Sequence, residues 1–555
     1  MTEILTPKLV SVLAEGYAPA RLKADMLAGL TVAIVALPLS MAIAIASGVT
    51  PDRGLYTAIV GGFLVSALGG SRFQVGGPAG AFIVLVAATV ARHGVEGLLL
   101  ATFLSGLILA LAGYLRLGKY IKLIPYPVTV GFTAGIAVII FASQLGELFG
   151  LRLAGGEPGP ILEKLAALWA ARPTLNPAAL GVAGLTIAVI LLLRRFRPSW
   201  PNLLIGVAVA SVATALLSLP ADTIGSRFGG IPRGLPVPAL PSFSPELVIA
   251  VLPDAVAFAL LGAIESLLSA VVADGMTGRR HRSSMELIAQ GVANIGSALF
   301  GGVCVTGTIA RTATNVRSGA TSPLSGMLHS AFLLAFMLVA APLASYIPLA
   351  ALAGVLAVVA FNMVERPAIA ALIRSSRGDA AILAVTFLLV VFRDLTEGIV
   401  VGFLLGAVLF IDRMGKAVNI REESVPRAVR AIENASEDSG LPERPLIADD
   451  PDTVIYRISG VFFFGAAASV GAVLDRIADQ RRNFVLDCSE VPFLDSTAAS
   501  IVEGLMRKAE KSGVRIFIAG LRPDMRRLLE AHEIHAPRVT FTETTDAAMA
   551  LIAAG

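Results

Sequence analysis

Apolar segments long enough to approach membrane-spanning length dominate the first three quarters of this chain. They fall near residues 26–47, 54–70, 78–92, 95–115, 126–148, 177–194, 202–219, 250–274, 285–300, 307–317, 324–342, 347–362, 379–393 and 396–412. A backbone within lipid must satisfy its polar groups internally, so these segments predict an α-helical membrane protein with 14 transmembrane segments. The charged residues, only 15% of the chain, agree with this, because soluble domains carry about 25%.

Basic residues predict how these segments are oriented. If the N-terminal residues 1–24 are cytoplasmic, every even-numbered segment ends in the cytoplasm. Lys and Arg gather after those segments, at Arg72, Arg116, Lys119, Lys122, Arg194, Arg195, Arg197, Arg279, Arg280, Arg282, Arg366, Arg374, Arg377, Arg413 and Lys416. An even count also places the C-terminus in the cytoplasm. Because the basic clusters are confined to loops, they indicate orientation in the lipid bilayer and not nucleic-acid binding.

The two halves of the membrane region are predicted to be inverted repeats. The loop at 220–246 is rich in proline and separates two groups of seven segments, while the other long loop, 149–176, includes a predicted surface helix at 160–171. Seven is odd, so the second half enters the membrane from the opposite side. The transmembrane region is therefore expected to cover residues 25–415.

Two short stretches at corresponding places in the halves predict a binding site. Residues 73–81 and 304–312 each follow a small-residue signal, and each opens a helix too short to cross a bilayer alone. Such pairs are typical of broken helices that meet at the membrane midplane. Since helix N-termini carry unpaired N–H groups and a partial positive charge, the pair predicts an anion site.

Small residues in these stretches have two interpretations. Glycine lets backbone approach a ligand, proline suits a first helical turn, and threonine offers a hydroxyl. Close helix packing in membranes uses small residues as well. The residues concerned are Gly76, Gly77, Pro78, Gly80, Gly307, Thr308 and Thr312.

Two charged residues lie at membrane depth. Glu265 is central in the eighth segment, where an acid is costly and is a functional candidate; we expect it to carry a proton. Arg311 begins the tenth helix and adds a full positive charge to the anion site. The alternatives are a structural acid at 265 and a permanent pair between Arg311 and Glu265. Leu39 and Ile43, which follow the helix-kinking Pro38, are expected on the pocket wall.

The C-terminal residues predict a small cytoplasmic α/β domain at 451–555, after a linker at 416–450. Strands are expected at 453–458, 483–487 and 514–519, with helices at 466–480, 496–512 and 523–532. Ser496 stands where a strand gives way to a helix. It either caps that helix or is a regulatory phosphorylation site.

Enzymatic chemistry is not indicated. Cys304 and Cys488 are far apart and form neither a disulfide framework nor a metal motif, so both are interpreted as packing residues. No nucleophile–base pair or metal cluster is evident, and no cofactor is expected.

With these motifs in place, the chain resembles the SulP anion transporters, the bacterial relatives of solute carrier family 26. The resemblance lies in Gly70–Phe73 running into Gly77–Pro78, in Ala263–Leu268, in Asp274–Gly278 and in Ala310–Arg317, and the C-terminal domain resembles a STAS domain. Within the family, Gly262–Pro323 is most similar to the bacterial C4-dicarboxylic acid transporter branch.

The resemblance implies a fold of two inverted seven-span repeats. A core domain from spans 1–4 and 8–11 would move against a gate domain, in homodimers in the bacterial inner membrane. The implied anion site uses Ala79, Gly80, Ala81, Thr308, Ile309, Ala310 and Arg311, with Leu39 and Ile43 nearby.

Departures from other family members bear on specificity. Some animal members have glutamine at the position of Leu39 and serine at that of Ala310, which makes the pocket expected here less polar. Sodium-dependent bicarbonate members carry aspartate where Glu265 stands and lack the arginine matching Arg311. A proton is therefore the expected coupling ion, in preference to sodium. Ala498 replaces the glycine usual in phosphorylated STAS domains, which weakens the regulatory interpretation of Ser496.

The expected function is proton-coupled symport of a small anion by alternating access. The substrate is a C4-dicarboxylate such as fumarate or succinate, or else sulfate or bicarbonate. The rival functions are an anion exchanger, a uniporter or channel-like path, and a membrane anion sensor that signals through the STAS domain to a cytoplasmic protein.

Overall fold

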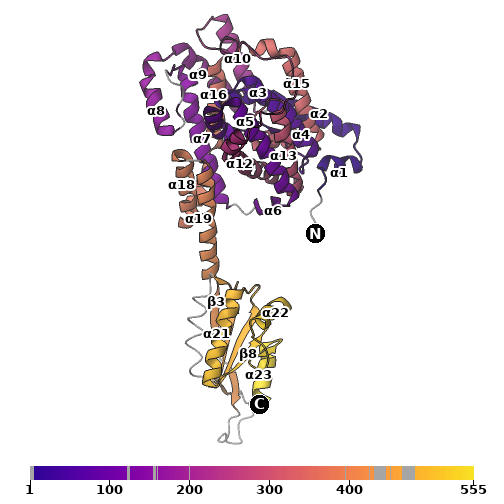
Figure 1. Ribbon diagram of the computed structural model, residues 1–555, viewed down its shortest axis with the longest axis vertical. Helices are drawn as coiled ribbons and strands as arrows, with labels where there is room; N and C mark the ends of the chain where they lie inside the picture. The colour runs from indigo at the N-terminus through magenta and orange to yellow at the C-terminus, as the bar shows by residue number, and fades with distance from the viewer. Residues whose placement is uncertain are drawn as a thin grey trace, which may run out of the picture. The chain divides into compact units, whose positions relative to one another are not determined.

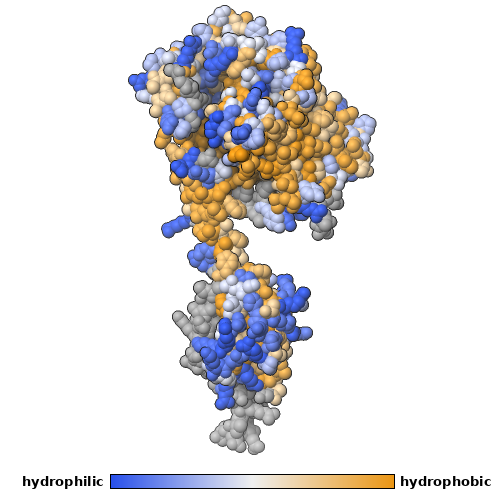
Figure 2. All heavy atoms as spheres, viewed as in Figure 1, coloured by the Kyte–Doolittle hydropathy of each residue, from blue (hydrophilic) through white to orange (hydrophobic). Residues whose placement is uncertain are grey.

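The computed structural model separates into two compact units, residues 1–404 and 405–555 (Figure 1). It describes residues 5–121, 125–153, 158, 160–198, 200–393, 395–423, 426–429, 446–449, 452–464 and 482–554. The first unit is helical and the second is α/β. Figure 2 shows a broad hydrophobic surface on the helical unit, as expected where lipid is the solvent.

Helices account for the membrane region in both halves. The first half contains α1 (Lys8–Ala14), α2 (Pro19–Ala46), α3 (Pro51–Tyr56), α4 (Gly62–Leu68), α5 (Ile83–Tyr114), α6 (Gly118–Ile121), α7 (Tyr126–Phe149), α8 (Ile161–Ala170), α9 (Pro177–Phe196), α10 (Asn202–Leu216) and α11 (Ile224–Phe228). The second half contains α12 (Pro245–Thr277), α13 (Ser283–Leu299), α14 (Ile309–Arg317), α15 (Leu324–Ala344), α16 (Leu349–Met363), α17 (Arg366–Ser375), α18 (Arg377–Phe392) and α19 (Leu395–Lys416).

Each of the fourteen predicted segments corresponds to helical structure, and the surface helix predicted at 160–171 is α8. The third and fourth segments share the label α5, but they are two helices that meet at Gly94, where the backbone is not helical and φ is 67°. Within the described residues, eight helices are long and apolar enough to cross a membrane by length and composition alone. The helix α14, which has nine residues, is too short to be one of these eight.

The two predicted helix breaks pair with each other as short strands. β1 (Gly76–Gly77) and β2 (Thr306–Gly307) run antiparallel, with Gly76 opposite Gly307. Each strand leads into a helix start: β1 is followed by the 3₁₀ turn Gly80–Phe82 and α5, and β2 is followed by α14. Pairing satisfies backbone groups that no helix satisfies there, and it brings the two helix N-termini together.

The helices pack as two groups. The core group consists of α2, α4, α5, α12, α13, α14 and α15, and the gate group consists of α7, α9, α10, α16 and α18. Contacts between the groups run mainly from α2 to α10 and α16, and from α5 to α7. These groups correspond to the core and gate predicted from the sequence.

The second unit is built on a five-stranded sheet in the order β3-β6-β7-β8-β9. Its strands are β3 (Asn419–Glu423), β6 (Thr453–Ser459), β7 (Asn483–Glu490), β8 (Arg515–Ala519) and β9 (Thr540–Thr542); β3 is antiparallel to β6 and the others run parallel. Its helices are α21 (Ser496–Ser512), α22 (Pro523–Ala531) and α23 (Thr545–Ala554), and a separate pair joins β4 (Pro426–Val429) to β5 (Leu446–Asp449).

The predicted strands and the last two predicted helices of this unit are confirmed, while the helix predicted at 466–480 lies outside the described residues. The sheet begins earlier than the domain boundary expected at 451. β3 lies inside the stretch expected to be a linker. Its partner β6 is distant in the sequence, since the β4–β5 pair comes between them, and this long-range pairing was not predicted.

Candidate functional site

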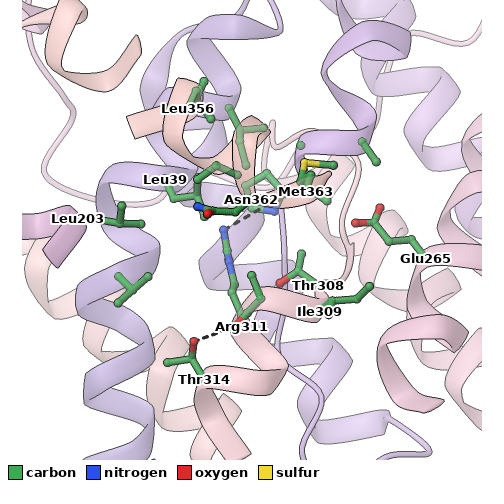
Figure 3. Close-up of a pocket in the computed structure, with 18 of the residues that line it drawn as sticks. Leu39, Leu203, Glu265, Thr308, Ile309, Arg311, Thr314, Leu356, Asn362 and Met363 are labelled. Carbon is green, nitrogen blue, oxygen red and sulfur yellow. Dashed lines mark hydrogen bonds between the residues drawn. The ribbon is translucent and has the colours of Figure 1, made fainter. Parts of the chain in front are cut away.

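A cavity of about 950 Å³ lies between the core and gate groups (Figure 3). The core wall comes from α2, the start of α5, α12 and α14. The gate wall comes from α7, α9, α10 and α16, and is mainly apolar near Phe132, Leu203, Leu356 and Met363. The cavity thus lies at the boundary between the two groups.

Nearly all the predicted site residues meet in this cavity, although they come from four separate parts of the sequence. Its lining includes Leu39, Ile43, Pro78, Ala79, Gly80, Ala81, Glu265, Thr308, Ile309, Ala310 and Arg311. Gly77 does not line it, and lies behind it in β1. The structure therefore brings together what the sequence proposed as a site.

Arg311 lies in the first turn of α14 and its residue surface is only 2% exposed. One guanidinium nitrogen, Nη2, donates hydrogen bonds to Ser40 Oγ at 3.0 Å and to Pro78 O at 3.4 Å, and Nη1 donates to Gly76 O at 3.3 Å. These acceptors are neutral. Within the described part of the chain, Arg311 forms no ion pair with Glu265, so the alternative of a permanent Arg311–Glu265 pair is not what the structure shows.

Gly77 makes room for that guanidinium. A Cβ atom built on Gly77 would lie 1.8 Å from Nη1 of Arg311, far inside van der Waals contact. Glycine at 77 is therefore explained by close approach of an arginine side chain, and the approach of a ligand is not needed to explain it.

The two helix starts add N–H groups to the cavity. Thr308 is the extended N-cap of α14, and the N–H groups of the first turn have no acceptor within the helix. Gly80 and Ala81 begin the turn that opens α5, directly after the extended Ala79. The hydroxyl of Thr308 is buried and has no hydrogen-bond partner within the described part of the chain. Together with Arg311, these groups form a positive, donor-rich surface suited to an anion.

Glu265 faces the same cavity from α12 (Figure 3). Its Oε2 atom is buried and has no hydrogen-bond partner among the residues that the structure describes. A structural acid would be expected to have its oxygens satisfied, because unpaired buried polar groups are costly. Within the described residues, Glu265 is therefore a buried acid with an unsatisfied oxygen in the cavity that Arg311 also lines.

Buried polar side chains that were not among the predicted site residues form hydrogen bonds to the backbone in and beside the two strands, and so brace them. Asn294 holds Val305 through both its amide atoms, at 2.8 and 3.0 Å, and Asn315 donates to Phe73 O at 2.9 Å. Gln74 donates to Ser266 Oγ at 2.9 Å. The sequence signal for these side chains was a polar residue within an otherwise apolar segment, as at Asn294 and Asn315.

Glu286 and Thr312 belong to the same bracing. Glu286 Oε2 accepts from the N–H groups of Gly70 and Ser71, at 2.8 and 3.1 Å. Thr312, considered above as a source of a ligand hydroxyl, instead accepts from Val75 N at 3.2 Å. It does not line the cavity.

In the second unit, Ser496 is exposed at the first position of α21. The cap of that helix is Asp495, whose Oδ1 accepts from Ala498 N at 2.9 Å. The interpretation of Ser496 as the cap is therefore wrong, because the residue before it has that role. Its regulatory role stays a prediction. Cys304 and Cys488 are both buried and free, in agreement with packing roles.

Comparison with known proteins identifies the family. Residues 22–386 match the sulfate permease family, and residues 444–548 match the STAS domain. The chain belongs to the sulfate permease family. YvdB of Bacillus subtilis is 38% identical over 526 residues, which cover 93% of this chain and 94% of YvdB. The bicarbonate transporter BicA of Picosynechococcus sp. is 31% identical over 519 residues, 92% of this chain and 90% of BicA.

Solved structures show the same fold. The transmembrane domain of a cyanobacterial BicA aligns with a TM-score of 0.61 at 31% identity, covering 69% of this chain and 98% of that domain. The murine anion transporter Slc26a9 aligns with a TM-score of 0.84 at 19% identity, covering 99% of this chain and 94% of the mouse chain. This sulfate permease family member is therefore a multi-pass membrane anion transporter with a C-terminal STAS domain, and is not an enzyme.

Proposed function

We propose that this transporter is a proton-coupled symporter of a small anion that works by alternating access. Arg311 and the two helix N-termini hold the anion, and Glu265 carries the proton. The observation that supports this most directly is that Glu265, with a free buried oxygen, lines the same cavity as Arg311.

Electrostatics couples the two ligands in this proposal. An anion beside Arg311 repels an ionised carboxylate in the same low-dielectric cavity, so the anion and the proton are best accommodated together. The loaded core group then moves against the gate group, and the cavity opens to the other side. Loss of the proton there restores the repulsion and favours release of the anion.

The proposed substrates are sulfate, bicarbonate and C4-dicarboxylates such as fumarate or succinate. The first two are supported by the family description and by the name of BicA. The third is supported by the resemblance of Gly262–Pro323 to dicarboxylate transporters. All of them carry oxygen acceptors that suit a guanidinium and helix N–H groups.

Uptake into proteoliposomes under an imposed pH gradient, with a panel of these anions, tests the proposal. Glu265→Gln should abolish gradient-driven accumulation while anion exchange or binding persists in part, because the amide carries no titrating proton. Glu246→Gln is the matched control, since Glu246 is exposed in the first turn of the same helix, α12. Undiminished accumulation in the Glu265 variant would remove this residue from the mechanism.

The same assay separates the rival mechanisms. Uptake that never exceeds electrochemical equilibrium would indicate a uniporter or a channel-like path. Uptake that requires a counter-anion inside the vesicle would indicate an exchanger. Sodium-driven uptake without a proton requirement would identify sodium as the coupling ion.

The proposal includes the orientation of the protein in the membrane and its assembly with partners. The distribution of Lys and Arg supports an orientation with both termini in the cytoplasm, and bacterial relatives such as YvdB support a bacterial inner-membrane location. We propose a homodimer whose STAS domain binds a cytoplasmic protein, with Ser496 exposed for phosphorylation.

A further inference from the structure

Three arginines line the cavity, and only one of them belongs to the site described above. Arg311 is buried, whereas Arg194 and Arg317 are exposed. Arg317 is the last residue of α14, six positions after Arg311. At the rise of an α-helix this places it about 9 Å further along the helix axis. We call these two exposed arginines, together with the lining residue Asn362, the arginine mouth.

The arginine mouth takes its two cations from opposite walls. Arg194 lies in the last turn of α9, in the gate group, and Arg317 lies at the end of α14, in the core group. Both arginines lie at the ends of even-numbered segments, so in the proposed orientation they stand on the cytoplasmic side of Arg311. An anion that moves between Arg311 and the cytoplasm would therefore encounter this side of the cavity.

Arg194 is held in position by a short chain of hydrogen bonds. Its Nη1 donates to Asn362 Oδ1 at 2.9 Å, and Asn362 Nδ2 in turn donates to Val358 O at 2.6 Å. A guanidinium has five N–H donors, so this neutral contact leaves most of them for a ligand.

The positive charge of the arginine mouth is not neutralised by the acids of the cavity. Two acids line the cavity, Glu265 and Glu365. Among the residues that the structure describes, neither forms an ion pair with Arg194 or Arg317. Arg317 has no hydrogen-bond partner in that part of the chain either. Both cations therefore have donors free for an oxygen-bearing anion.

Resting on the proposed function, we infer that the arginine mouth is a second anion-binding station, which holds the transported oxyanion or dicarboxylate on the cytoplasmic side of Arg311 before it leaves the cavity. Two guanidinium groups that line one cavity, neither of them in an ion pair within the described residues, favour a doubly charged ligand over a singly charged one. In the orientation proposed above, this station faces the cytoplasm.

Binding of radiolabelled sulfate to the purified full-length protein tests this inference. Arg311→Gln should leave a weaker sulfate-binding component that belongs to the arginine mouth. Adding Arg194→Gln or Arg317→Gln to that variant should weaken the remaining component at least about tenfold, the scale of one lost charge-assisted contact. Lysine at either position should restore part of it, because lysine keeps the charge.

Arg195→Gln is the matched control, because Arg195 is a neighbouring exposed arginine that does not line the cavity. The second station is refuted if the Arg311 variant loses all sulfate binding, or if the control weakens the remaining component as much as the Arg194 variant. It is also refuted if wild-type protein binds no sulfate. Proton-driven uptake is measured on the same wild-type preparation, so failure of proton coupling with intact two-component binding is distinguishable from failure of the station.

Discussion

Arg311 combines a buried charge with neutral partners, and this combination explains why an anion would bind beside it. A buried ion without a counter-ion is unfavourable, and carbonyl and hydroxyl oxygens only partly compensate for lost hydration. Its three acceptors fix the direction of the guanidinium but leave its net charge in place. An incoming anion supplies the missing counter-charge.

Ser40 provides a test of this positioning. Ser40→Ala removes the shortest of the three recorded contacts of Arg311 and should weaken anion binding about tenfold, within the range for a hydrogen bond to a charged group. Ser47→Ala is the control, because the hydroxyl of Ser47 bonds only to Ile43 O of its own helix. Equal affinities of the two variants, measured by binding of labelled anion, would contradict the positioning role.

Gly77 provides a second test at the same scale. Gly77→Ala places a methyl group where Nη1 of Arg311 lies, so the guanidinium must shift. We expect anion transport to fall at least about tenfold and the unfolding free energy to fall by about 1–3 kcal/mol, as for an overpacked site. Transport rates and thermal unfolding of the purified variant measure these effects.

Gly184→Ala is the appropriate comparison for that variant. Apart from the nearby backbone of its own helix, α9, no atom of the described residues lies within 4 Å of a Cβ built on Gly184. Replacement there should leave transport unchanged and should not destabilise the helix. If the Gly77 variant transports as well as this control, the position of the Arg311 guanidinium does not depend on glycine at 77.

At the scale of elements, the strands β1 and β2 place extended backbone inside a helical membrane domain. Two paired residues on each strand cannot satisfy all the neighbouring backbone groups, so side chains complete the pairing. Asn294 does this for Val305 and Asn315 for Phe73 O. The helix starts are thus held in place by the bracing, independently of any ligand.

Asn294→Leu should therefore act on stability. It leaves the N–H and the C=O of Val305 buried without these partners, at a cost of about 2–6 kcal/mol for two unsatisfied groups. Thr89→Val is a mild control, because that hydroxyl bonds only to Leu85 O one turn away. Thermal unfolding in detergent compares them, and a similar melting temperature for both variants would contradict the bracing role.

Local signals explain which parts of this architecture the sequence predicted. Glycine and proline near Gly77 and Pro78 marked the helix breaks, and Arg311 stood out as a charge at membrane depth. The pairing of Gly76 with Gly307 depends on residues far apart in the chain, and local patterns carry no trace of it. The gate wall was missed for a related reason: apolar residues such as Leu356 have the same pattern whether they face lipid, a helix or a cavity.

At the scale of the molecule, the two units have separate hydrophobic cores. In the second unit, Val454, Phe484, Val502 and Ile518 pack into one cluster with residues of the same unit. The proposed site lies wholly within the first unit, since all its lining residues come before position 366. Anion transport should therefore depend on the first unit, and the STAS domain should modulate it.

Truncation after Lys416 tests this division. The cut keeps α19 whole and removes β3 together with the sheet it belongs to, whereas a cut near residue 440 would leave β3 without its partner β6. We expect the truncated protein to retain measurable anion flux in proteoliposomes, and Glu265→Gln to abolish its pH-driven accumulation as in the full chain. A truncated protein that unfolds cooperatively but carries no flux would contradict this. It would instead support a sensor or an obligatory role of the STAS domain, because the complete cavity would then be insufficient for transport.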